Sequence, residues 1–452
     1  MQYGTSMVTN KGTPPGPTLP AAAQALQWIG RPYLFLRECY GQFGDVFSLD
    51  FGEQARYVVF SHPDAIRDIF TTPSSVLQVG PGNAVLQPLV GRTSLLLLEQ
   101  EAHVQERRFL MPAFQQKTVA GYASIIRDAL LDATSTWSSG HEFVAHSFLQ
   151  GVSIEVILKA VFGLHPGPKC AELQRDLVEL LNDKHLSMGV LGRLRDGVLD
   201  PALSSLQRRV ARLRAVTLEI IDDRKTGATP VGNDILSMLL ASTDEAGVGR
   251  PAESVADELL TLVVTGHDTT ATALAWGLFW ICSHPEVESA LRQELAGCVG
   301  IDDLRAIAQL TYLDATCKEI LRIHPIVPAV FRQVVKPYSV SGYDFEPGTI
   351  LSPNIYLTHH RPELYPNSDA FDPGRHLTRA YSPYEYLPFG GGARRCIGMH
   401  LALYEMKIII ALLIQRYDLR LAPNQHVAPV RRMVAIAPST GPRVVVAGVH
   451  AP

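Results

Sequence analysis

The sequence predicts a mainly α-helical protein with small β-sheets, and two observations support this fold class. Apolar residues recur at spacings of three and four almost continuously from residue 101 to residue 322, which is the helical period. Short segments rich in β-branched and aromatic residues, bounded by glycine and proline, lie at residues 33–75 and after Pro325. No internal repeat or low-complexity linker divides the chain. We therefore expect one domain over residues 21–452, after a proline-rich leader at residues 1–20.

Each expected element follows from its local pattern. β-branched and aromatic residues predict two early strands, and the long helical stretch includes a glycine- and proline-containing loop. Short strands between turn residues follow Pro325, and then an apolar helix and a last pair of strands complete the chain. The expected elements are strands at 46–49 and 57–60, a loop at 227–233, a helix at 252–282, strands at 334–335, 338–340 and 349–351, a helix at 398–417, and a hairpin around 438–442.

Composition excludes several classes of protein. Of 452 residues, 46% are hydrophobic and 19% charged, and the formal net charge is −4, so a disordered chain or a nucleic-acid-binding protein is not expected. The longest apolar run, at residues 408–414, is far shorter than the ~20 residues that span a bilayer, so no transmembrane anchor is expected. The six cysteines contain no C-x-x-C pair, and residues 1–10 do not resemble a secretory signal. Both features favour a cytoplasmic protein.

Residues 252–282 form the most informative predicted helix. It is apolar on most sides, which is typical of a helix that runs through the core, and His284-Pro285 ends it. Its middle reads Thr265-Gly266-His267-Asp268-Thr269-Thr270. The threonine hydroxyls could simply bond back to the preceding turn and bend the helix. However, a buried carboxylate is costly unless it is paired or hydrated, and an interrupted helix leaves room for water. The pair Asp268 and Thr269 could therefore relay protons to a group bound against the helix.

A second candidate site is the glycine-rich segment FGGGARRCIG at residues 389–398, directly before a predicted helix. Three glycines let the backbone turn sharply and approach a flat partner closely. Cys396 lies just before the helix start, where free N–H groups favour a thiolate, and Arg394 and Arg395 add positive charge. A buried, inert thiol is the common alternative. Cys396 and His400 also have zinc-like spacing, but no second such pair lies nearby.

At this point the chain resembles the cytochrome P450 family, because four motifs occur in the family's order across essentially the whole sequence. They are the haem-binding loop with Phe389, Gly392, Arg394, Cys396 and Gly398; the oxygen-activating motif with Gly266, Asp268 and Thr269; the E-x-x-R helix with Glu319 and Arg322; and the segment FDPGR at 371–375, which supplies Arg375. Two positions depart from the family pattern. Thr265 replaces the usual alanine or glycine, and Gly374 replaces the usual glutamate.

The resemblance implies haem b as cofactor and a role for each matched residue. Cys396 would be the axial iron ligand, and Asp268 and Thr269 would deliver protons for oxygen activation. Glu319, Arg322 and Arg375 would form a structural triad, while Phe389, Gly392 and Gly398 would shape the cysteine loop. The cations implied for the haem propionates are His103, Arg107, Arg332 and Arg394.

The implied function is a monooxygenase that inserts one oxygen atom of O₂ into an apolar, medium-sized substrate such as a terpenoid, fatty acid, steroid or polyketide, as in the hydroxylations of secondary metabolism. An H₂O₂-using peroxygenase and a non-enzymatic thiolate-haem sensor are the alternatives. The acid–alcohol pair argues against the first, and the lack of an output domain argues against the second. The expected pocket walls are residues 77–97 and 181–191 together with Val263, Val264, Thr265, Val327, Ala329, Val330, Val434 and Ala435.

Electrons are expected from a separate ferredoxin or flavodoxin with its reductase, because the sequence has no Gly-rich flavin or dinucleotide motif and no four-cysteine cluster. By resemblance, such a partner would dock on the cysteine side of a monomer. The basic residues expected to receive it are Arg107 or Arg108, Arg395 and Lys407.

Overall fold

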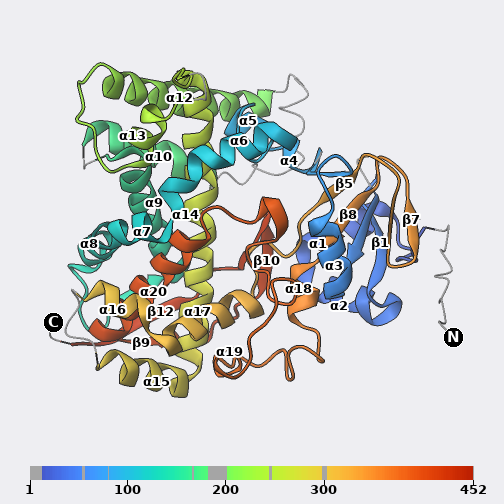
Figure 1. Ribbon diagram of the computed structural model, residues 1–452. Helices are drawn as coiled ribbons and strands as arrows, with labels where there is room; N and C mark the ends of the chain where they lie inside the picture. The colour runs from blue at the N-terminus through green and yellow to red at the C-terminus, as the bar shows by residue number, and fades with distance from the viewer. Residues whose placement is uncertain are drawn as a thin grey trace.

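The computed structural model describes residues 13–52, 56–79, 81–164, 167–181, 201–243, 247–297 and 303–450. Within these ranges helices predominate and short strands form small sheets, which confirms the predicted fold class. Figure 1 shows the helices gathered around α14, with the largest sheet on the side where the N-terminus lies. The expected pocket segment at residues 181–191 lies, from residue 182 onward, outside the described residues.

The helices form where apolar residues recur with the helical period. In chain order they are α1 (Ala21–Gly30), α2 (Pro32–Phe43), α3 (Pro63–Thr71), α4 (Pro81–Ala84), α5 (Gln87–Val90), α6 (Gln100–Leu110), α7 (Gln116–Val119), α8 (Ala123–Thr134), α9 (Ala145–Phe162), α10 (Pro168–Leu181), α12 (Pro201–Lys225), α13 (Ile235–Ala241), α14 (Ala252–Ser283), α15 (Pro285–Leu295), α16 (Leu304–Gln309), α17 (Thr311–Ile323), α18 (Ile355–His359), α19 (Arg375–Thr378) and α20 (Met399–Arg416), with 3₁₀ turns at Met111–Phe114, Ala120–Tyr122 and Gly392–Arg394.

The strands predicted near both ends are present, together with β4, which lies inside the stretch predicted as helical. The strands are β1 (Val46–Asp50), β2 (Arg56–Phe60), β3 (Leu77–Gln78), β4 (Glu142–Val144), β5 (Arg332–Val334), β6 (Tyr338–Val340), β7 (Tyr343–Phe345), β8 (Ile350–Pro353), β9 (Tyr417–Leu421), β10 (Pro429–Arg432), β11 (Ala435–Pro438) and β12 (Arg443–Val449). The largest sheet has the order β1-β2-β8-β5-β3, in which β2 and β8 are parallel.

The final hairpin predicted around residues 438–442 is wrong. β11 and β12 flank these residues, but β11 pairs with β10, whereas β12 lies between β4 and β9. The chain leaves one sheet for another because Gly441 packs directly against β4 and α9, and a Cβ added there would lie 2.8 Å from Val144 Cγ1. The hairpin that does form is β10–β11, and Met433 takes the positive φ of 52° in its turn.

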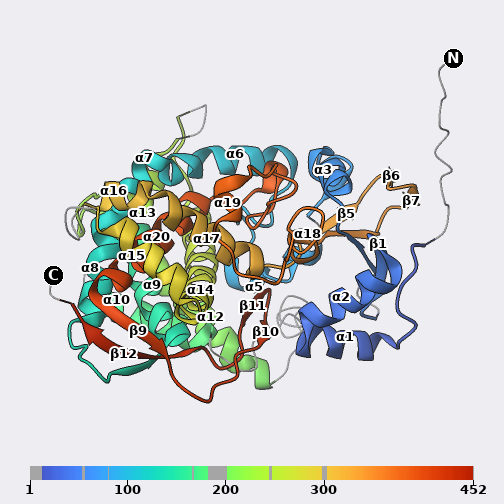
Figure 2. The same ribbon diagram turned by 90° about the horizontal axis from the view of Figure 1, so that it is seen from below.

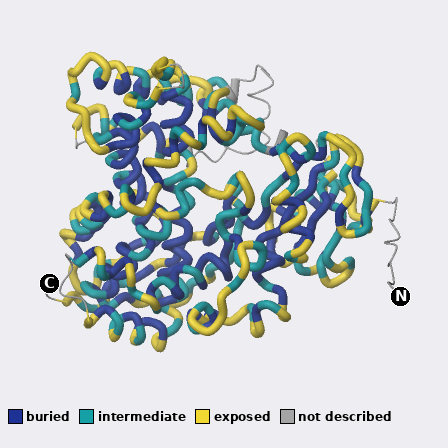
Figure 3. The backbone as a smooth tube through the Cα atoms, viewed as in Figure 1, coloured by how far each residue is buried: buried dark blue, intermediate teal, exposed yellow. Residues whose placement is uncertain are grey.

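Helix α14 is the centre of the core, as its apolar surface predicts. It has 32 residues, or about 48 Å at ~1.5 Å per residue, and α9 and α20 pack along it. Figure 3 shows buried backbone concentrated inside the helical part and in the N-terminal sheet. Near its end, Trp276 is buried, stacks on His324 with ring centroids 3.7 Å apart, and donates a hydrogen bond to the backbone of β11.

The helix is not interrupted in its middle, contrary to expectation. It is one continuous α-helix over Ala252–Ser283, and the threonine hydroxyls bond back along it. Thr265 Oγ1 donates to the Thr261 carbonyl at 2.7 Å, and Thr269 Oγ1 donates to the Thr265 carbonyl at 2.8 Å. A carbonyl can accept a second hydrogen bond, so these hydroxyls are satisfied without opening a turn.

The proline-rich leader is held against the first strand. The backbone N–H of Ser48 donates to the Pro15 carbonyl at 2.7 Å, and its hydroxyl donates to the Pro14 carbonyl at 2.9 Å. A Cβ on Gly16 would lie 2.1 Å from the Ser48 carbonyl oxygen, so this close approach requires glycine.

One helix among the described residues, α9, is long and apolar enough by composition to cross a membrane. However, 72% of that stretch is buried inside the protein, where it packs against α8 and α14. Such burial is typical of a core helix.

Candidate functional site

The cysteine loop is shaped by a close approach to α3. Cβ atoms on Gly391 and Gly392 would lie 2.3 Å from the Phe70 ring and 2.4 Å from the Phe70 carbonyl oxygen, and Gly392 has a φ of +65°. Phe70 is therefore the described neighbour that requires these glycines. The backbone N–H of Cys396 donates to the Phe389 carbonyl at 3.0 Å, which closes the loop just before α20 begins.

Cys396 is surrounded by protein atoms, and yet its side chain is exposed. Burial raises the pKa of its thiol, although hydrogen bonds from the backbone N–H groups of Gly398 and Met399 and the charge of Arg107 act in the opposite direction. The expectation that the helix start and the arginines lower this pKa overall is therefore wrong for the free thiol, because burial outweighs them. The thiol is nevertheless exposed. A thiol that is desolvated and also exposed is explained if Cys396 borders a space that the protein surrounds.

Helix α14 contributes a second open surface in the middle of the core. Thr265 is exposed, and Val264, Gly266, Asp268 and Thr269 are half-buried, whereas residues 255–263 and 270–278 on either side are buried. A mid-helix turn with this exposure borders open space. It contains the acid–alcohol pair predicted from the sequence.

The two side chains of that pair contact different groups. Thr269 bonds back along α14, whereas Asp268 Oδ1 accepts a hydrogen bond from Gln150 Nε2 at 3.1 Å and lies 3.5 Å from His146 Nε2. Burial would raise the pKa of Asp268, but the hydrogen bond to His146 and the charges around it lower the pKa overall. His146 and Gln150, one helical turn apart on α9, were not predicted from the sequence, because only the packing of α9 on α14 brings them to Asp268.

The four predicted propionate ligands lie close enough to influence one another. Burial and the charges of Arg394, Arg107 and Arg332 lower the pKa of His103 to about 4. Burial and Arg394 lower the pKa of Arg332 to about 10. Arg394 bonds Glu99 Oε2 at 2.6 Å, whereas no carboxylate among the described residues forms an ion pair with Arg107 or Arg332. The cluster therefore has an excess of positive charge in a desolvated place, which is the property of an anion-binding site.

The predicted triad is assembled and fully buried, and it has a fourth member. Glu319 accepts hydrogen bonds from Arg322 at 2.7 and 2.8 Å and from Arg375 at 2.9 Å. His376 Nε2 lies 3.0 Å from the other carboxylate oxygen. Burial would raise the pKa of Glu319, but hydrogen bonds from His376 and Arg322 lower it to about 2. His376 could have been noticed as the neighbour of Arg375, but its contact depends on the fold of residues 371–378. At the departure Gly374, the backbone N–H donates to Asp372 Oδ1 at 2.9 Å.

The predicted pocket walls are distributed over several elements. Val264 is half-buried and packs on the core cluster beside the N-terminal half of α14, while Ala329 forms a backbone bridge with Asn354. Val330 packs against the N-terminal sheet, 3.9 Å from a Cβ added at Gly390. Val327 and Val434 are half-buried.

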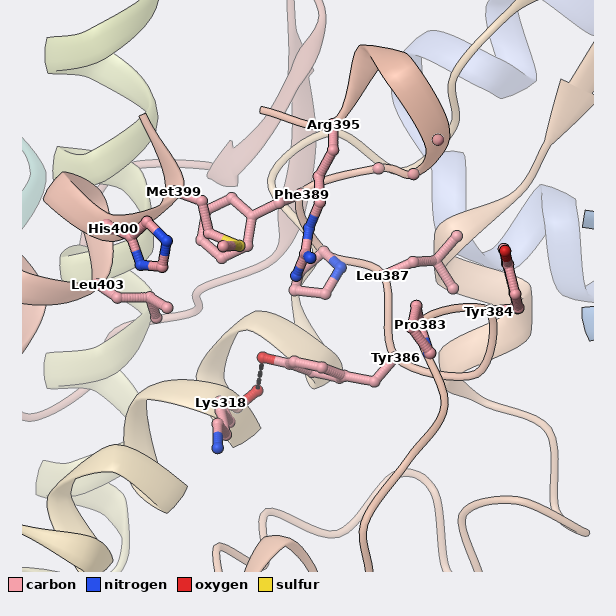
Figure 4. Close-up of a pocket in the computed structure, with 14 residues that line it drawn as sticks. Lys318, Pro383, Tyr384, Tyr386, Leu387, Phe389, Arg395, Met399, His400 and Leu403 are labelled. Atoms are coloured by element: carbon pink, nitrogen blue, oxygen red, sulfur yellow. Dashed lines mark hydrogen bonds between the residues drawn. The ribbon is translucent and has the colours of Figure 1, made fainter. Parts of the chain in front are cut away.

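The outer side of the cysteine loop has a pocket of about 400 Å³ that Arg395, His400 and Lys318 line together with aromatic residues (Figure 4). Arg395 is exposed there, and Arg108 is exposed on α6. The expectation that Lys407 presents a free charge is wrong. Its ammonium bonds Asp314 Oδ1 at 2.6 Å and the Ala308 carbonyl at 3.1 Å, and its side chain is only 14% exposed.

Together, a helical fold and an enclosed thiol beside a cluster of cations define a protein suited to hold an anionic metal cofactor on a cysteine. Comparison with known proteins identifies the family to which such a protein belongs. The cytochrome P450 family profile matches residues 14–443. Cytochrome P450 135B1 of Mycobacterium tuberculosis is 33% identical over 444 residues, which cover 97% of this chain and 92% of that protein.

Solved structures agree in fold. The structure described as retinoic acid bound cyanobacterial CYP120A1 has a TM-score of 0.82 at 25% identity, covering 98% of this chain and 100% of that one. The cytochrome P450DA haem domain has a TM-score of 0.81 at 21% identity, covering 96% and 97%. The chain therefore belongs to the cytochrome P450 family, as the sequence resemblance indicated. It is an oxygen-incorporating haem monooxygenase of the family whose iron is held by a cysteine thiolate.

We expect Glu319→Ala to lower the free energy of unfolding by ~3–5 kcal/mol at neutral pH, because two buried arginines would lose their counter-charge. Chemical denaturation measures the effect. The exposed pair Asp64–Arg67 has the same i,i+3 spacing, and Asp64→Asn should cost below ~1 kcal/mol. The folded pKa of Glu319 is depressed, so its contribution is present above the ordinary carboxyl pKa of ~4.3 and is lost as pH falls through about 2. Equal losses in both variants would contradict the network.

Proposed function

We propose that the protein inserts one oxygen atom of O₂ into an apolar, medium-sized substrate bound between Cys396 and the open turn of α14. The observation that carries this proposal is the exposure of two groups that lie next to the buried core, the Cys396 thiol and the turn at Thr265. Residues 21–452 would form one haem domain behind a leader at residues 1–20, acting as a monomer. The described cysteines are free thiols, which supports a cytoplasmic location.

In this proposal the chain's own residues hold the cofactor. Haem supplies the oxygen-activating redox chemistry when it is bound. Cys396 would be its axial ligand, and the N–H groups of Gly398 and Met399 would donate to the sulfur and tune it. His103, Arg107, Arg332 and Arg394 would hold the propionates, since their excess of charge is matched by two carboxylates. Phe389, Gly392 and Gly398 would keep the loop in shape.

Asp268 and Thr269 would control protons. Asp268 keeps a lowered pKa and a histidine partner, so it can accept a proton on the α9 side and release it toward Thr269 after rotation of its side chain. The Thr269 hydroxyl would hold water and a proton at the open turn. This pair supports the use of O₂ over the peroxygenase alternative, because H₂O₂ already carries both protons and both electrons. Nothing among the described residues specifically favours the sensor alternative.

The substrate class rests on the chemistry of the walls. The described wall residues Val264, Val327, Val330 and Val434 are aliphatic, and Thr265 adds a hydroxyl on α14. Terpenoid, fatty acid, steroid and polyketide substrates would suit such walls, as in a hydroxylation of secondary metabolism. One similar structure is described as binding retinoic acid, which is a terpenoid, and this supports the first of the four classes.

Cys396→Ser is expected to abolish the absorption band that reduced, thiolate-ligated haem shows with carbon monoxide, because the soft sulfur ligand is lost. The spectrum of reduced protein with carbon monoxide measures this. Cys317→Ser is the control, since this thiol is fully buried on α17, and it should leave the band in place. An unchanged band in Cys396→Ser would refute the ligand assignment.

Thr269→Ala is expected to lower the yield of product per NADPH several-fold and to raise the yield of peroxide, because the hydroxyl that holds water at the open turn is removed. Asp268→Asn should instead slow turnover by roughly 10²-fold, since it cannot pass a proton. Thr270→Ala is the matched control, because Thr270 is buried and bonds back to Gly266. The ratio of product to NADPH measures coupling, and an unchanged ratio in Thr269→Ala would contradict the proton role.

Electrons should arrive from a separate ferredoxin or flavodoxin that docks at the pocket beside the cysteine loop. Arg395→Glu is expected to slow electron transfer several-fold at low salt, and added salt should slow the wild type, because screening acts over ~8–10 Å. Stopped-flow reduction measures both effects. Lys407→Gln should matter less, since that charge is already paired. A rate indifferent to salt and to Arg395→Glu would contradict docking at this face.

A further inference from the structure

Arg431, on β10, resembles the arginines of the cation cluster in having a pKa that burial lowers, but it lies outside that cluster. Among the described arginines, four have a lowered pKa because of burial: Arg107, Arg332, Arg394 and Arg431. The first three belong to the proposed propionate cluster. Burial lowers the pKa of Arg431 to about 10, and none of the other three contributes to that shift.

Arg431 is half-buried, and the fully buried arginines outside the cluster are neutralised. Arg224 bonds Asp234 at 2.8 Å, and Arg322 and Arg375 share Glu319. Arg431 has no such partner among the residues that the structure describes. Its Nε donates to the Met433 carbonyl at 2.8 Å. Because a desolvated cation without a counter-charge costs free energy, an arginine kept in this state is typical of a binding site for an anion.

Two aromatic residues complete the surroundings of this guanidinium. Its central carbon lies 4.9 Å from the centroid of the Trp28 ring on α1, which restrains its plane and leaves its outer N–H groups available. Tyr57 on β2 belongs to the same aromatic group, because the rings of Trp28 and Tyr57 both pack on Phe51, with centroids 6.4 and 5.4 Å away. Arg431 and Tyr57 also shift each other's pKa. No hydrogen bond occupies the Tyr57 hydroxyl among the described residues. The outer N–H groups of Arg431 and the hydroxyl of Tyr57 are therefore hydrogen-bond donors without a partner among the described residues, and they belong to the same small region.

Arg431 lies on the strand that leads to the turn facing α14, because β10 pairs with β11 and β11 packs against α14. Arg431 precedes the β10–β11 turn, and Val434 of that turn is a predicted pocket wall. The next residue, Arg432, influences the charge of Asp268. On the other side, the Tyr57 ring packs on Phe331, with centroids 5.2 Å apart, next to Arg332 of the cation cluster. Figures 1 and 2 show β10 between α14 and the part of the chain formed by α1 and β1.

We propose that Arg431 and the Tyr57 hydroxyl bind the carboxylate of the substrate, so that the molecules oxidised are amphiphiles with an apolar body and an acidic end. The inference rests on the proposed function, since it places the apolar body at the open turn of α14. It also orients the substrate. With the acid held at β10, the oxidised carbon lies away from the carboxylate.

The test compares acids with their methyl esters, which keep the body and remove the charge. Dodecanoic acid, hexadecanoic acid and retinoic acid, each with its ester, are titrated into the haem-loaded full-length protein, and binding is followed by absorption spectroscopy and calorimetry. At least one acid should bind ten-fold or more tightly than its ester. Arg431→Met should reduce that ratio to near one by weakening the acid alone. Tyr57→Phe should weaken the acid several-fold, and Arg431→Lys should restore part of the preference.

The matched control is Arg379→Met, because Arg379 also lies 4.9 Å from a ring centroid, that of Tyr381, but pairs with Glu385. It should leave every dissociation constant unchanged. Equal affinities for acid and ester, equal weakening of both by Arg431→Met, or loss of haem from that variant would overturn the inference. Failure of all six compounds to bind, with the carbon monoxide band intact, would overturn it as well. Absence of that band in the wild type would instead overturn the proposed function.

Discussion

The structure depends on two opposing requirements of α14. The helix is buried along most of its length, and yet its turn at Thr265 is exposed. Burial comes from α9 and α20, which pack along the helix, and from the stacking of Trp276 on His324. The opening needs no break in the helix, because threonine hydroxyls bond back to carbonyls that already serve the helix. The site thus lies on a rigid element, and the loop that carries Cys396 is held by its approach to Phe70.

Charges inside the protein fall into two groups that serve different purposes. Where the fold needs rigidity, cations and carboxylates are matched, as in the Glu319 network and the Arg224–Asp234 pair. Where we propose that a ligand binds, cations are left in excess, as at Arg107 and Arg332 and again at Arg431. The free energy spent on these unmatched charges is recovered when an anion arrives, so the two groups separate structural from binding residues without reference to any motif.

The sequence allowed us to predict those elements whose residues lie close together along the chain. The cysteine loop, the E-x-x-R helix and the long central helix each have their chemistry within a few residues, and the structure places them as separate, well-formed elements. Contacts between distant segments could not be predicted in the same way. The partners of Asp268 come from α9, Lys407 pairs with Asp314, and β12 joins a different sheet from β11. Each of these depends on tertiary packing, which one sequence read element by element does not contain.

The contact between Asp268 and His146 has a consequence for the movement of small molecules. His146 begins α9 beside Gly441, where an added Cβ would lie 3.2 Å from the histidine's own Cβ, and Thr440 of the same turn is exposed. His146 therefore contacts both the acid and a turn that has an exposed residue. The two ring nitrogens of His146 can pass a proton to the acid, while Arg431 and Trp28 belong to a different part of the chain. In the proposed function, protons and the substrate would therefore depend on different elements, with His146 of α9 serving the first and Arg431 of β10 the second.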